Sequence, residues 1–396
     1  MENSWQEVKL GQVLGKSGYI RGPFGSALRR NELQPSGIPV YEQQHAIYDD
    51  RTFRYFIDDE KHKELYRFTV KPNDLIISCS GTLGRVSIIK ENDPTGIISQ
   101  ALLLLRPDTR LILPKFLYYF FRSPKGFQSI VSVSSGSVQV NIAKRSDVEN
   151  VRIDLPPLSE QRAIAGILGA LDDKIELNRR MNRTLESIAR AVFRQWFVGG
   201  EEKDWEEKPL DEIASFLNGL ALQKYPAEEN GEYLPVIKIA QLRKNDTTDA
   251  DTASPNIPGE YIVDDGDVLF SWSGSLEVVI WCGGKGALNQ HLFKVTSQNY
   301  PKWFYYLWTK HHLPEFRLIA AGKATTMGHI QRHHLHQATV ITPPEKELKE
   351  MDKVMSPILE LIINNEKESC TLASLRDSLL PKLMKGEVRV KEIEKA

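Results

Sequence analysis

Cysteine is scarce in this chain, whose 396 residues include only Cys79, Cys282 and Cys370. Three widely spaced cysteines exclude a disulfide framework and a zinc cluster, and they indicate a reducing compartment. The longest aliphatic run, Ala101 to Leu105, is far too short to cross a bilayer. The first residues also lack the basic and apolar regions of a signal peptide. We therefore expect a soluble, cytoplasmic protein.

Excess charge of one sign is missing too. Lys and Arg number 51 against 52 Asp and Glu, which leaves a formal net charge of −1. No overall positive field would therefore hold the chain on nucleic acid or a membrane, so DNA binding would rest on local patches or on a partner's charge. The length and an apolar fraction of 41% are enough for at least two globular domains.

Catalytic signatures are also lacking. Amino-methyltransferases carry an Asp/Asn-Pro-Pro-aromatic segment, but the two Pro-Pro pairs here are followed by Leu158 and Glu345. The segment 321–325 resembles a phosphate-binding loop, yet Arg317 and Ala324 replace its first Gly and its Ser or Thr. These departures argue against an enzyme that acts alone.

Two further groups of residues suggest metal or nuclease chemistry without completing it. Asp74 and Asp267 precede matched strands, but no Glu-x-Lys follows, so we expect them to cap turns. The candidate metal ligands form neither an HExxH motif nor a Cys-paired finger, so no metal site is expected. They are His311, His312, His333, His334 and His336.

The second half of the chain restates the first in order. WQEVKL from Trp5 matches WEEKPL from Trp205, and VKPNDLIISCSGTL at 70–83 matches VDDGDVLFSWSGSL at 263–276. IPVYEQQ and LPVIKIAQ are predicted strands, whereas PKFLYYFFRS and PKWFYYLWTK are predicted helices with aromatic faces. Gln100 and Gln290 also match. The alternative, chance similarity among short apolar strands, does not account for six ordered blocks.

Each repeat ends with a Pro-Pro pair and a long charged segment, and the first of these segments has no Pro and only two Gly, Gly166 and Gly169, which predicts a long helix. The first segment has Ser159 as its expected N-cap. Apolar residues of the first segment recur at alternating steps of four and three residues, which predicts a coiled-coil seam. Adding 187 to their residue numbers gives the corresponding seam of the second segment. Its expected interface is Ile164, Leu168, Leu171, Ile175 and Leu185 in the first helix and Met355, Ile358, Ile362, Leu372 and Leu379 in the second.

Both seams have a polar centre, with Asn178 and Asn182 in the first and Asn365 and Ser369 in the second. A buried Asn fixes register at some loss of stability. If the helices pair antiparallel, Asn178 and Asn365 meet at the centre. The alternative is that both asparagines face solvent.

These features predict an α+β fold. Two tandem α/β domains with pseudo-twofold symmetry would be separated by two long antiparallel coiled-coil helices. The expected divisions are a first domain at 1–157, a first helix at 158–198, a second domain at 199–344 and a second helix at 345–396.

The segment Asp154 to Phe197 resembles the spacer region of the specificity subunits of type I restriction-modification enzymes. GPFGSAL at 22–28 and NGLALQKY at 218–225 resemble the beginnings of that family's target recognition domains. The second helix departs from the pattern, because Pro343 to Glu347 lacks the Ser and the Glu-Gln pair. Contacts with methylation subunits are therefore less securely carried over there.

The resemblance implies a non-catalytic subunit that recognises a bipartite DNA target, one half-site per domain, with the helices as a spacer ruler. It implies two methylation subunits, which bind S-adenosylmethionine and methylate adenine, and restriction subunits, which hydrolyse ATP and cleave. S-adenosylmethionine, ATP and magnesium are expected on these partners and no cofactor on this chain.

The repeat also suggests which residues touch DNA, because residues common to both domains would be framework and differing polar residues would read bases. Ser80-Gly81, Ser273-Gly274, Gln100 and Gln290 are thus framework. The expected base readers are Gln43, Gln44, His45, Ser135, Ser137 and Gln139 against Lys238, Gln241, Lys323, Thr325, Thr326 and His329. The expected phosphate contacts are Arg29, Arg30, Lys144 and Arg145 against Lys224, Arg243, Lys244, Gln331 and Arg332. Ordinary solvated side chains are the alternative for each.

Two other functions compete with DNA recognition. The first is a structural adaptor that carries two peptide-binding domains on a coiled coil. The second is a self-contained methyltransferase or nuclease, which the missing motifs disfavour.

Overall fold

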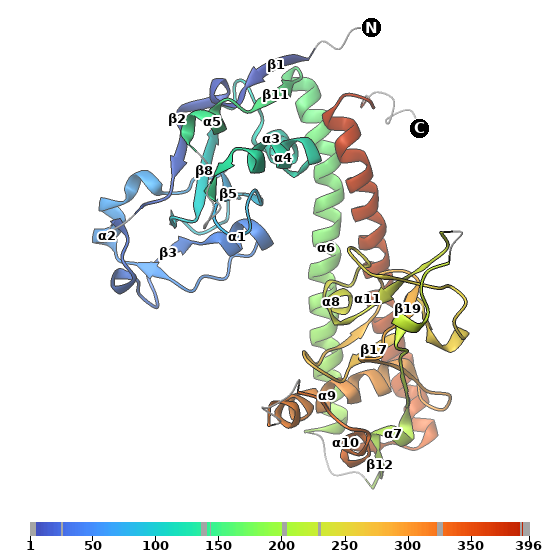
Figure 1. Ribbon diagram of the computed structural model, residues 1–396. Helices are drawn as coiled ribbons and strands as arrows, with labels where there is room; N and C mark the ends of the chain where they lie inside the picture. The colour runs from blue at the N-terminus through green and yellow to red at the C-terminus, as the bar shows by residue number, and fades with distance from the viewer. Residues whose placement is uncertain are drawn as a thin grey trace. The chain divides into compact units, whose positions relative to one another are not determined.

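A computed structural model describes residues 5–24, 27–135, 141–142, 144–199, 204–228, 231–322, 328–388 and 390. The chain divides into two compact units (Figure 1). Unit 1 comprises Met1–Asp172 and Ser374–Ala396, and unit 2 comprises Asp173–Ala373. Two long helices, α6 (Leu158–Phe197) and α11 (Glu345–Met384), each contribute residues to both units. In the part of the chain that is described, no helix is long and apolar enough to span a membrane.

The centre of unit 1 is a four-stranded antiparallel sheet in the order β2-β8-β5-β6. Its strands are β2 (Leu14–Arg21), β8 (Leu102–Pro107), β5 (Leu75–Ser78) and β6 (Val86–Ile88). Alternate residues of β8 enter different cores, because Leu103 and Leu105 pack toward α3 while Leu102 and Leu104 pack toward β3. Burial on both faces explains why β5 and β8 are nearly continuous aliphatic runs.

The remaining elements of unit 1 cover this sheet. One small sheet has the order β4-β3-β7, with β3 and β7 parallel, and two other strand pairs are β1-β11 and β9-β10. These strands are β1 (Gln6–Lys9), β3 (Ile38–Tyr41), β4 (Phe56–Ile57), β7 (Ile97–Ile98), β9 (Ser134–Ser135), β10 (Asn141–Ile142) and β11 (Arg152–Leu155). The helices are α1 (Gln43–Tyr48), α2 (Asp59–Glu64), α3 (Pro114–Arg122), α4 (Pro124–Ser132) and α5 (Arg145–Glu149).

Unit 2 repeats this topology. Its sheets have the orders β13-β20-β17-β18 and β15-β14-β19-β16, with β14 and β19 parallel, and β12 pairs with β21. The strands are β12 (Glu206–Pro209), β13 (Ser215–Asn218), β14 (Leu234–Ile237), β15 (Thr252–Ala253), β16 (Ile262–Val263), β17 (Val268–Ser271), β18 (Val278–Ile280), β19 (Gly286–Leu288), β20 (Leu292–Thr296) and β21 (Thr339–Thr342). The helices are α7 (Leu210–Ile213), α8 (Ile239–Lys244), α9 (Lys302–Ala321) and α10 (Arg332–Gln337). The predicted mixed fold, written twice, is confirmed.

Two local expectations were wrong. The predicted strands IPVYEQQ and LPVIKIAQ end at Tyr41 and Ile237, and a short helix follows each. Helix α6 begins at Leu158, so Ser159 is not its N-cap; the Pro157 carbonyl accepts the first bonds, from the amides of Glu160 and Gln161.

The two long helices pack antiparallel, as predicted. In unit 2 the Nδ2 of Asn182 donates to the carbonyl of Ile362 at 3.2 Å, and that of Asn178 donates to the carbonyl of Asn365 at 3.3 Å. The earlier residue of α6 thus contacts the later residue of α11, which means that the two helices run in opposite directions. The buried interface residues are Ile164, Leu168, Ile175, Asn178, Met355, Ile362 and Asn365; the half-buried ones are Leu171, Leu185, Ile358, Leu372 and Leu379.

The polar centre lies inside the helix pair and not in solvent. Asn178 is fully buried, and its Nδ2 also donates to Glu368 Oε2 at 2.8 Å. Asn365 donates in turn to Asn182 Oδ1 at 2.9 Å. Because each amide finds its partner on the other helix, this cluster of Asn178, Asn182, Asn365 and Ser369, the asparagine lock, fixes the register.

Arg376 occupies a seam position of α11 where an apolar residue would ordinarily lie. Its Nη1 pairs with Asp172 Oδ1 at 2.7 Å, and the other oxygen of Asp172 accepts from Tyr119 Oη at 2.7 Å. The residues at the corresponding positions of unit 2 are Ala189 and Leu359, which are buried and apolar. The same seam is thus closed by an ion pair in unit 1 and by apolar packing in unit 2.

The three cysteines are shielded from solvent. Cys79 and Cys282 are buried and Cys370 is half-buried. Burial raises the pKa of the Cys79 and Cys282 thiols to about 12 and also raises the pKa of Cys370. All three therefore remain neutral thiols near neutral pH.

Candidate nucleic-acid interface

In both units, the residue that follows the first strand of the central sheet is a glycine whose backbone amide donates to the neighbouring strand. The Gly22 amide donates to the carbonyl of Leu102 at 3.0 Å, and the Gly219 amide donates to that of Leu292 at 3.0 Å. A Cβ on Gly22 would lie 1.9 Å from the Ser99 carbonyl oxygen, so this crossing requires glycine. Arg21 and Asn218, the residues before these glycines, therefore occupy equivalent places.

A second shared feature is the turn before each inner strand. Asp74 Oδ2 accepts the Lys71 amide at 2.7 Å, and Asp267 Oδ2 accepts the Asp264 amide at 2.9 Å. The two carboxylates therefore cap their turns, as expected. The residues at the start of the turns, Lys71 and Asp264, are equivalent in position and opposite in charge.

Three of the six expected base readers of unit 1, Gln43, Gln44 and His45, lie at the start of α1. Gln43 Nε2 donates to the Thr82 carbonyl at 3.1 Å, and Gln44 Nε2 donates to the Thr52 carbonyl at 3.2 Å. His45 is fully buried, and its Nδ1 accepts the Glu42 amide at 2.6 Å. Ser135 contributes its backbone to β9, whereas Ser137 and Gln139 lie outside the described residues.

Their counterparts in unit 2 lie at the start of α8. Lys238 forms an ion pair with Asp251. Gln241 is buried and accepts the Lys238 amide at 3.4 Å, the same capping role that His45 has in α1. His329 is half-buried and edge-on to Trp272, with ring centroids 6.3 Å apart. The other three, Lys323, Thr325 and Thr326, lie outside the described residues.

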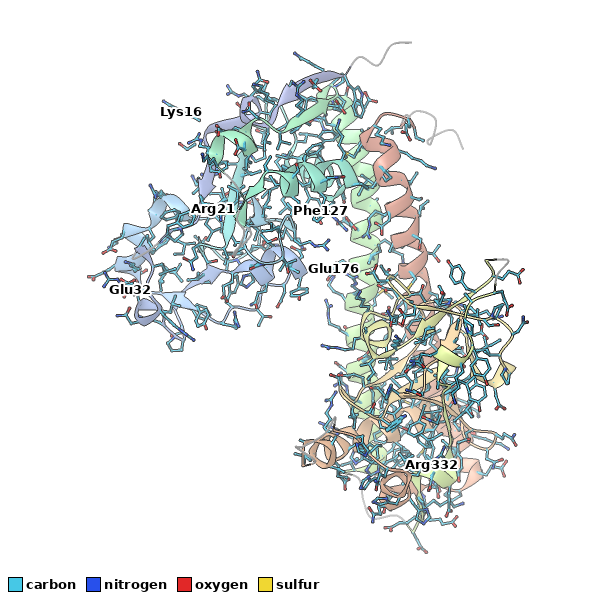
Figure 2. The ribbon with its side chains drawn as sticks, viewed as in Figure 1. Lys16, Arg21, Glu32, Phe127, Glu176 and Arg332 are labelled. Atoms are coloured by element: carbon cyan, nitrogen blue, oxygen red, sulfur yellow. The ribbon has the colours of Figure 1, made fainter. Side chains whose placement is uncertain are left out.

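The expected phosphate contacts are exposed in both units. They are Arg29, Arg30, Lys144 and Arg145 in unit 1 and Lys224, Arg243, Lys244, Gln331 and Arg332 in unit 2. Two of them are spatial counterparts, since Arg145 begins α5 over the Tyr19 ring and Arg332 begins α10 over the Phe293 ring. Figure 2 labels Arg332 in unit 2.

A basic groove in unit 1 was not predicted from the sequence. It has a volume of about 690 Å³ and is lined by Arg21, Arg67, Lys71, Arg106 and Arg145, among other residues. None of its described lining residues is acidic, although the chain as a whole carries no excess of positive charge. Of its cations only Arg145 was among the expected phosphate contacts. Arg21 directly precedes the GPFGSAL segment, and Arg67, Lys71 and Arg106 are scattered along the sequence.

The cations of this basic groove differ in how far they are already neutralised. Arg106 forms a two-pronged ion pair with the buried Asp74, both N–O distances being 2.7 Å; burial raises the Asp74 pKa and Arg106 opposes that shift. Arg145 pairs with Glu149 at 2.7 Å. Arg21 lies beside the Cys79 thiol and lowers its pKa, although burial dominates. Its Nη1 is buried and has no hydrogen-bond partner among the described residues.

The equivalent strand ends in unit 2 carry Asn218, Trp272, Ser273 and His291. Trp272, which corresponds to Cys79, donates its Nε1 to Asn218 Oδ1 at 2.8 Å. His291 Nδ1 lies 3.0 Å from Ser273 Oγ, and its ring is 5.9 Å from that of Trp272. The two units thus present different chemistry on the same frame.

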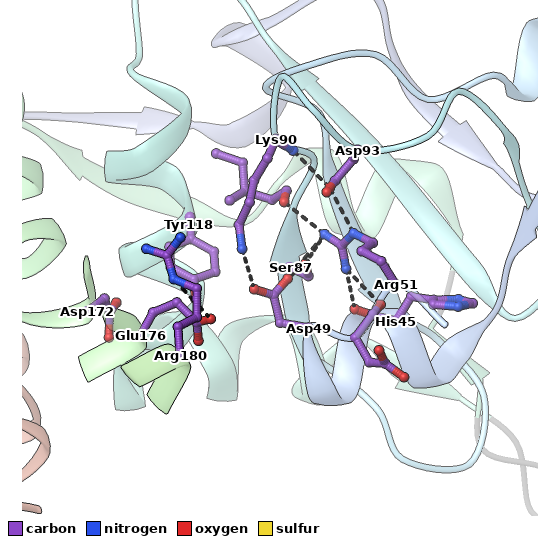
Figure 3. A network of polar contacts seen from close by, with 12 residues as sticks. His45, Asp49, Arg51, Ser87, Lys90, Asp93, Tyr118, Asp172, Glu176 and Arg180 are labelled. Carbon is purple, nitrogen blue, oxygen red and sulfur yellow. Dashed lines mark hydrogen bonds and ion pairs between the residues drawn. The ribbon is translucent and has the colours of Figure 1, made fainter. Parts of the chain in front are cut away.

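Figure 3 shows a charged network near α1 in which Asp49, Arg51, Ser87, Lys90 and Asp93 all belong to unit 1; it also draws Glu176 and Arg180 of unit 2. Arg51 donates to Asp93 at 2.7 Å and to Ser87 at 3.0 Å, while Lys90 pairs with Asp49 at 3.1 Å. Because every charge shown here has an opposite partner, the network holds the loop after α1 against β6 and leaves no cation free for a ligand.

Four of the candidate metal ligands form two neighbouring pairs, with ring centroids 5.2 Å apart for His311 and His312 and 3.9 Å apart for His333 and His334. His311 lies 5.4 Å from the Trp308 ring, and burial lowers its pKa. His336 lies 3.1 Å from Asp211. Over the residues that the structure describes, no three His, Cys, Asp or Glu side chains come together as a metal site.

The start of α6 is built into unit 1. Gln161 is buried; its Oε1 accepts the Leu113 amide at 2.8 Å, and its Nε2 donates to the carbonyls of Pro156 and Leu111. Trp5 Nε1 donates to Glu160 Oε2 at 3.0 Å. Glu160 and Gln161, the pair that the first long helix has and the second lacks, therefore form hydrogen bonds within unit 1.

Known proteins resemble the chain over nearly its whole length. Residues 2–187 and 202–372 match the model of the type I restriction modification DNA specificity domain. A type I restriction enzyme MjaIX specificity subunit from Methanocaldococcus jannaschii is 27% identical, covering 99% of this chain and 98% of that protein. The EcoKI specificity subunit of Escherichia coli is 26% identical over 93% of this chain and 84% of its own length.

A solved structure shares the fold. The crystal structure of the S subunit of a type I restriction-modification system from M. genitalium aligns with a TM-score of 0.61 at 16% identity, covering 97% of each chain. Two matches to one family model, on two units of one topology, agree with the repeat in the sequence. The chain therefore belongs to the type I restriction-modification DNA specificity family.

Proposed function

We propose that this chain recognises DNA for a type I restriction-modification complex. Unit 1 and unit 2 each read one half of a bipartite target, and partner subunits methylate adenine and cleave. The observation that carries the proposal is the repetition of one framework with different polar side chains at equivalent positions, such as Arg21 and Asn218. Two half-sites of different sequence require two domains that share a framework but differ in the side chains that contact the bases.

The long helices supply the spacer between the half-sites in this proposal. Each contains 40 residues, which corresponds to a length of about 60 Å at 1.5 Å per residue. The asparagine lock prevents the helices from sliding by a heptad, because sliding would leave buried amides without partners. A fixed register gives a fixed spacing, at most about one and three-quarter turns of B-DNA.

Partner subunits would supply the chemistry. Both helices expose apolar side chains within unit 2, namely Leu177 and Ile188 on α6 and Val354 and Leu361 on α11. Exposed apolar side chains on a rigid helix pair suit the docking of methylation subunits. Because Gln161 is buried within unit 1, the proposed docking surface uses these outward residues instead.

The decisive experiment maps methylated adenines in a host genome with and without the gene, its partner genes being present. Loss of methylation at one bipartite motif is the expected result. Unchanged methylation would refute the proposal. Incubation of the chain alone with labelled S-adenosylmethionine and DNA should transfer no label, whereas transfer would favour a self-contained methyltransferase.

Individual contacts are tested by a randomised target library. Replacing Gln139 is expected to change preference in the first half-site alone, and replacing Lys144 to weaken all sequences alike. Equal effects of both substitutions on every sequence would contradict the division into base-reading and phosphate-contacting residues. A peptide-binding adaptor would show no salt-sensitive, sequence-selective retention of DNA at all.

A further inference from the structure

Three of the five cations that line the basic groove of unit 1, Arg21, Arg67 and Lys71, have no cationic counterpart in unit 2. The turns before β5 and β17 correspond residue by residue, so Lys71 corresponds to Asp264. A single 3₁₀ turn precedes each, at Tyr66–Phe68 and at Gly259–Tyr261, and each ends two residues before a matched valine. Arg67 therefore corresponds to Glu260. With Arg21 and Asn218 at the crossing glycines, three cations of unit 1 correspond to one amide and two carboxylates.

These three cations are available to a ligand. Arg67 and Lys71 are exposed, and neither forms an ion pair within the described parts of the chain. Arg67 lies over the Phe68 ring at 4.4 Å, which orients its guanidinium without neutralising it. Figure 2 labels Arg21, in unit 1. Arg21 is half-buried and lines the groove, and its buried Nη1 has no acceptor among the described residues.

The groove also carries aromatic surface beside its charge. Phe24 is 62% exposed, and the Arg21 guanidinium lies 5.4 Å from its ring centroid. Tyr66, at the start of the 3₁₀ turn, is also exposed. Cations interleaved with exposed rings on a surface without carboxylates suit a sugar-phosphate backbone, whose phosphates are anionic and whose sugars are apolar.

We propose that Arg21, Arg67 and Lys71 grip the phosphate backbone of duplex DNA at the first half-site, and that unit 2 binds its half-site without an equivalent grip. This inference rests on the proposed function. Glu260 and Asp264 would repel a phosphate at the corresponding place, where unit 2 instead offers the hydrogen-bonding groups of Asn218, Trp272 and His291. The salt dependence that arises at this position therefore comes from unit 1.

The test measures how the affinity of the full chain for DNA depends on potassium chloride. The probe is a fluorescein-labelled duplex of mixed sequence, long enough to span two half-sites. The variant is Arg21→Gln/Arg67→Gln/Lys71→Gln, and the matched control is Lys9→Gln/Lys90→Gln/Lys125→Gln, which removes the same charge from unit 1 outside the groove. Each phosphate contact contributes about 0.9 to the slope of log K against log salt.

The groove variant is expected to lose about two to three from the magnitude of that slope, and the control to lose less than about one. The reverse variant, Glu260→Arg/Asp264→Lys, should steepen the slope by up to about two. Circular dichroism and thermal melting check folding; since Arg21→Gln removes a buried unpaired nitrogen, it is not expected to unfold unit 1.

Two results would overturn the inference separately from the proposed function. A groove variant with the wild-type slope, or with the same loss as the control, removes the asymmetric grip while DNA recognition stands. Failure of the wild-type chain to retain the duplex at any salt concentration refutes DNA recognition itself and this inference with it.

Discussion

Residues with different chemistry sometimes perform the same task in the two units. His45 and Gln241 both accept the amide of the residue three positions earlier, at the start of α1 and α8. The sequence comparison marked both as base readers because they differ and are polar. Their burial was not visible to that comparison, since a capping side chain and a reading side chain draw on the same residue types.

Loss of the Gln161 side chain should clearly lower the stability of unit 1. Replacing it with Leu, the residue at the corresponding position 348, leaves the buried Leu113 amide and two carbonyls without partners. We expect Gln161→Leu to lower the free energy of unfolding by about 1–3 kcal/mol, measured by urea denaturation. Gln195→Leu, on the exposed surface of the same helix, should change it by less than about 0.5 kcal/mol. Equal losses from both would contradict this role.

At the scale of elements, periodicity predicted the long helices well and the short elements less well. The heptad pattern and its offset of 187 residues located α6, α11 and their antiparallel pairing, because many residues contribute to one signal. The strand-to-helix changes at Glu42 and Lys238 escaped prediction. There one backbone-to-side-chain hydrogen bond decides the structure, and no period extends over so few residues.

The asparagine lock can be tested as a pair. Asn365→Ala removes the donor to Asn182 Oδ1 and leaves that oxygen buried, so we expect a loss of about 1–3 kcal/mol in unfolding free energy. The double variant Asn182→Leu/Asn365→Leu should recover most of that loss, because two apolar residues then replace two amides. A double-mutant cycle in urea with the single variants Asn182→Leu and Asn365→Leu measures the coupling. A double variant as unstable as the summed single variants would show that the amides act independently.

At the scale of the whole molecule, the repeat made the architecture predictable, whereas the basic groove was not. Internal similarity at six blocks is a property of the chain order and can be read directly. The groove joins Arg21, Arg67, Lys71, Arg106 and Arg145, which no spacing rule connects. Only folding β2, β8 and the turn before β5 together reveals that these cations share one surface.

The two units have separate cores, so damage to one should remain local. Hydrogen exchange read by mass spectrometry should show that Gln161→Leu speeds exchange in α3, next to Gln161, and leaves β17 and β20 of unit 2 protected. The Asn365→Ala variant should show the reverse preference. Uniform loss of protection in both units from either change would mean that the molecule unfolds as a single cooperative block.

The shielded thiols make the native chain a convenient background for site-specific dyes. With a pKa of about 12, the thiolate fraction of Cys79 or Cys282 at pH 8 is on the order of 10⁻⁴, so maleimide should modify the folded protein slowly. Cysteines introduced at exposed positions outside the expected DNA contacts, such as Glu91 in unit 1 and Gln298 in unit 2, would react far faster. Energy transfer between dyes at those positions would then follow the separation of the two units as DNA is added, with every native cysteine left in place.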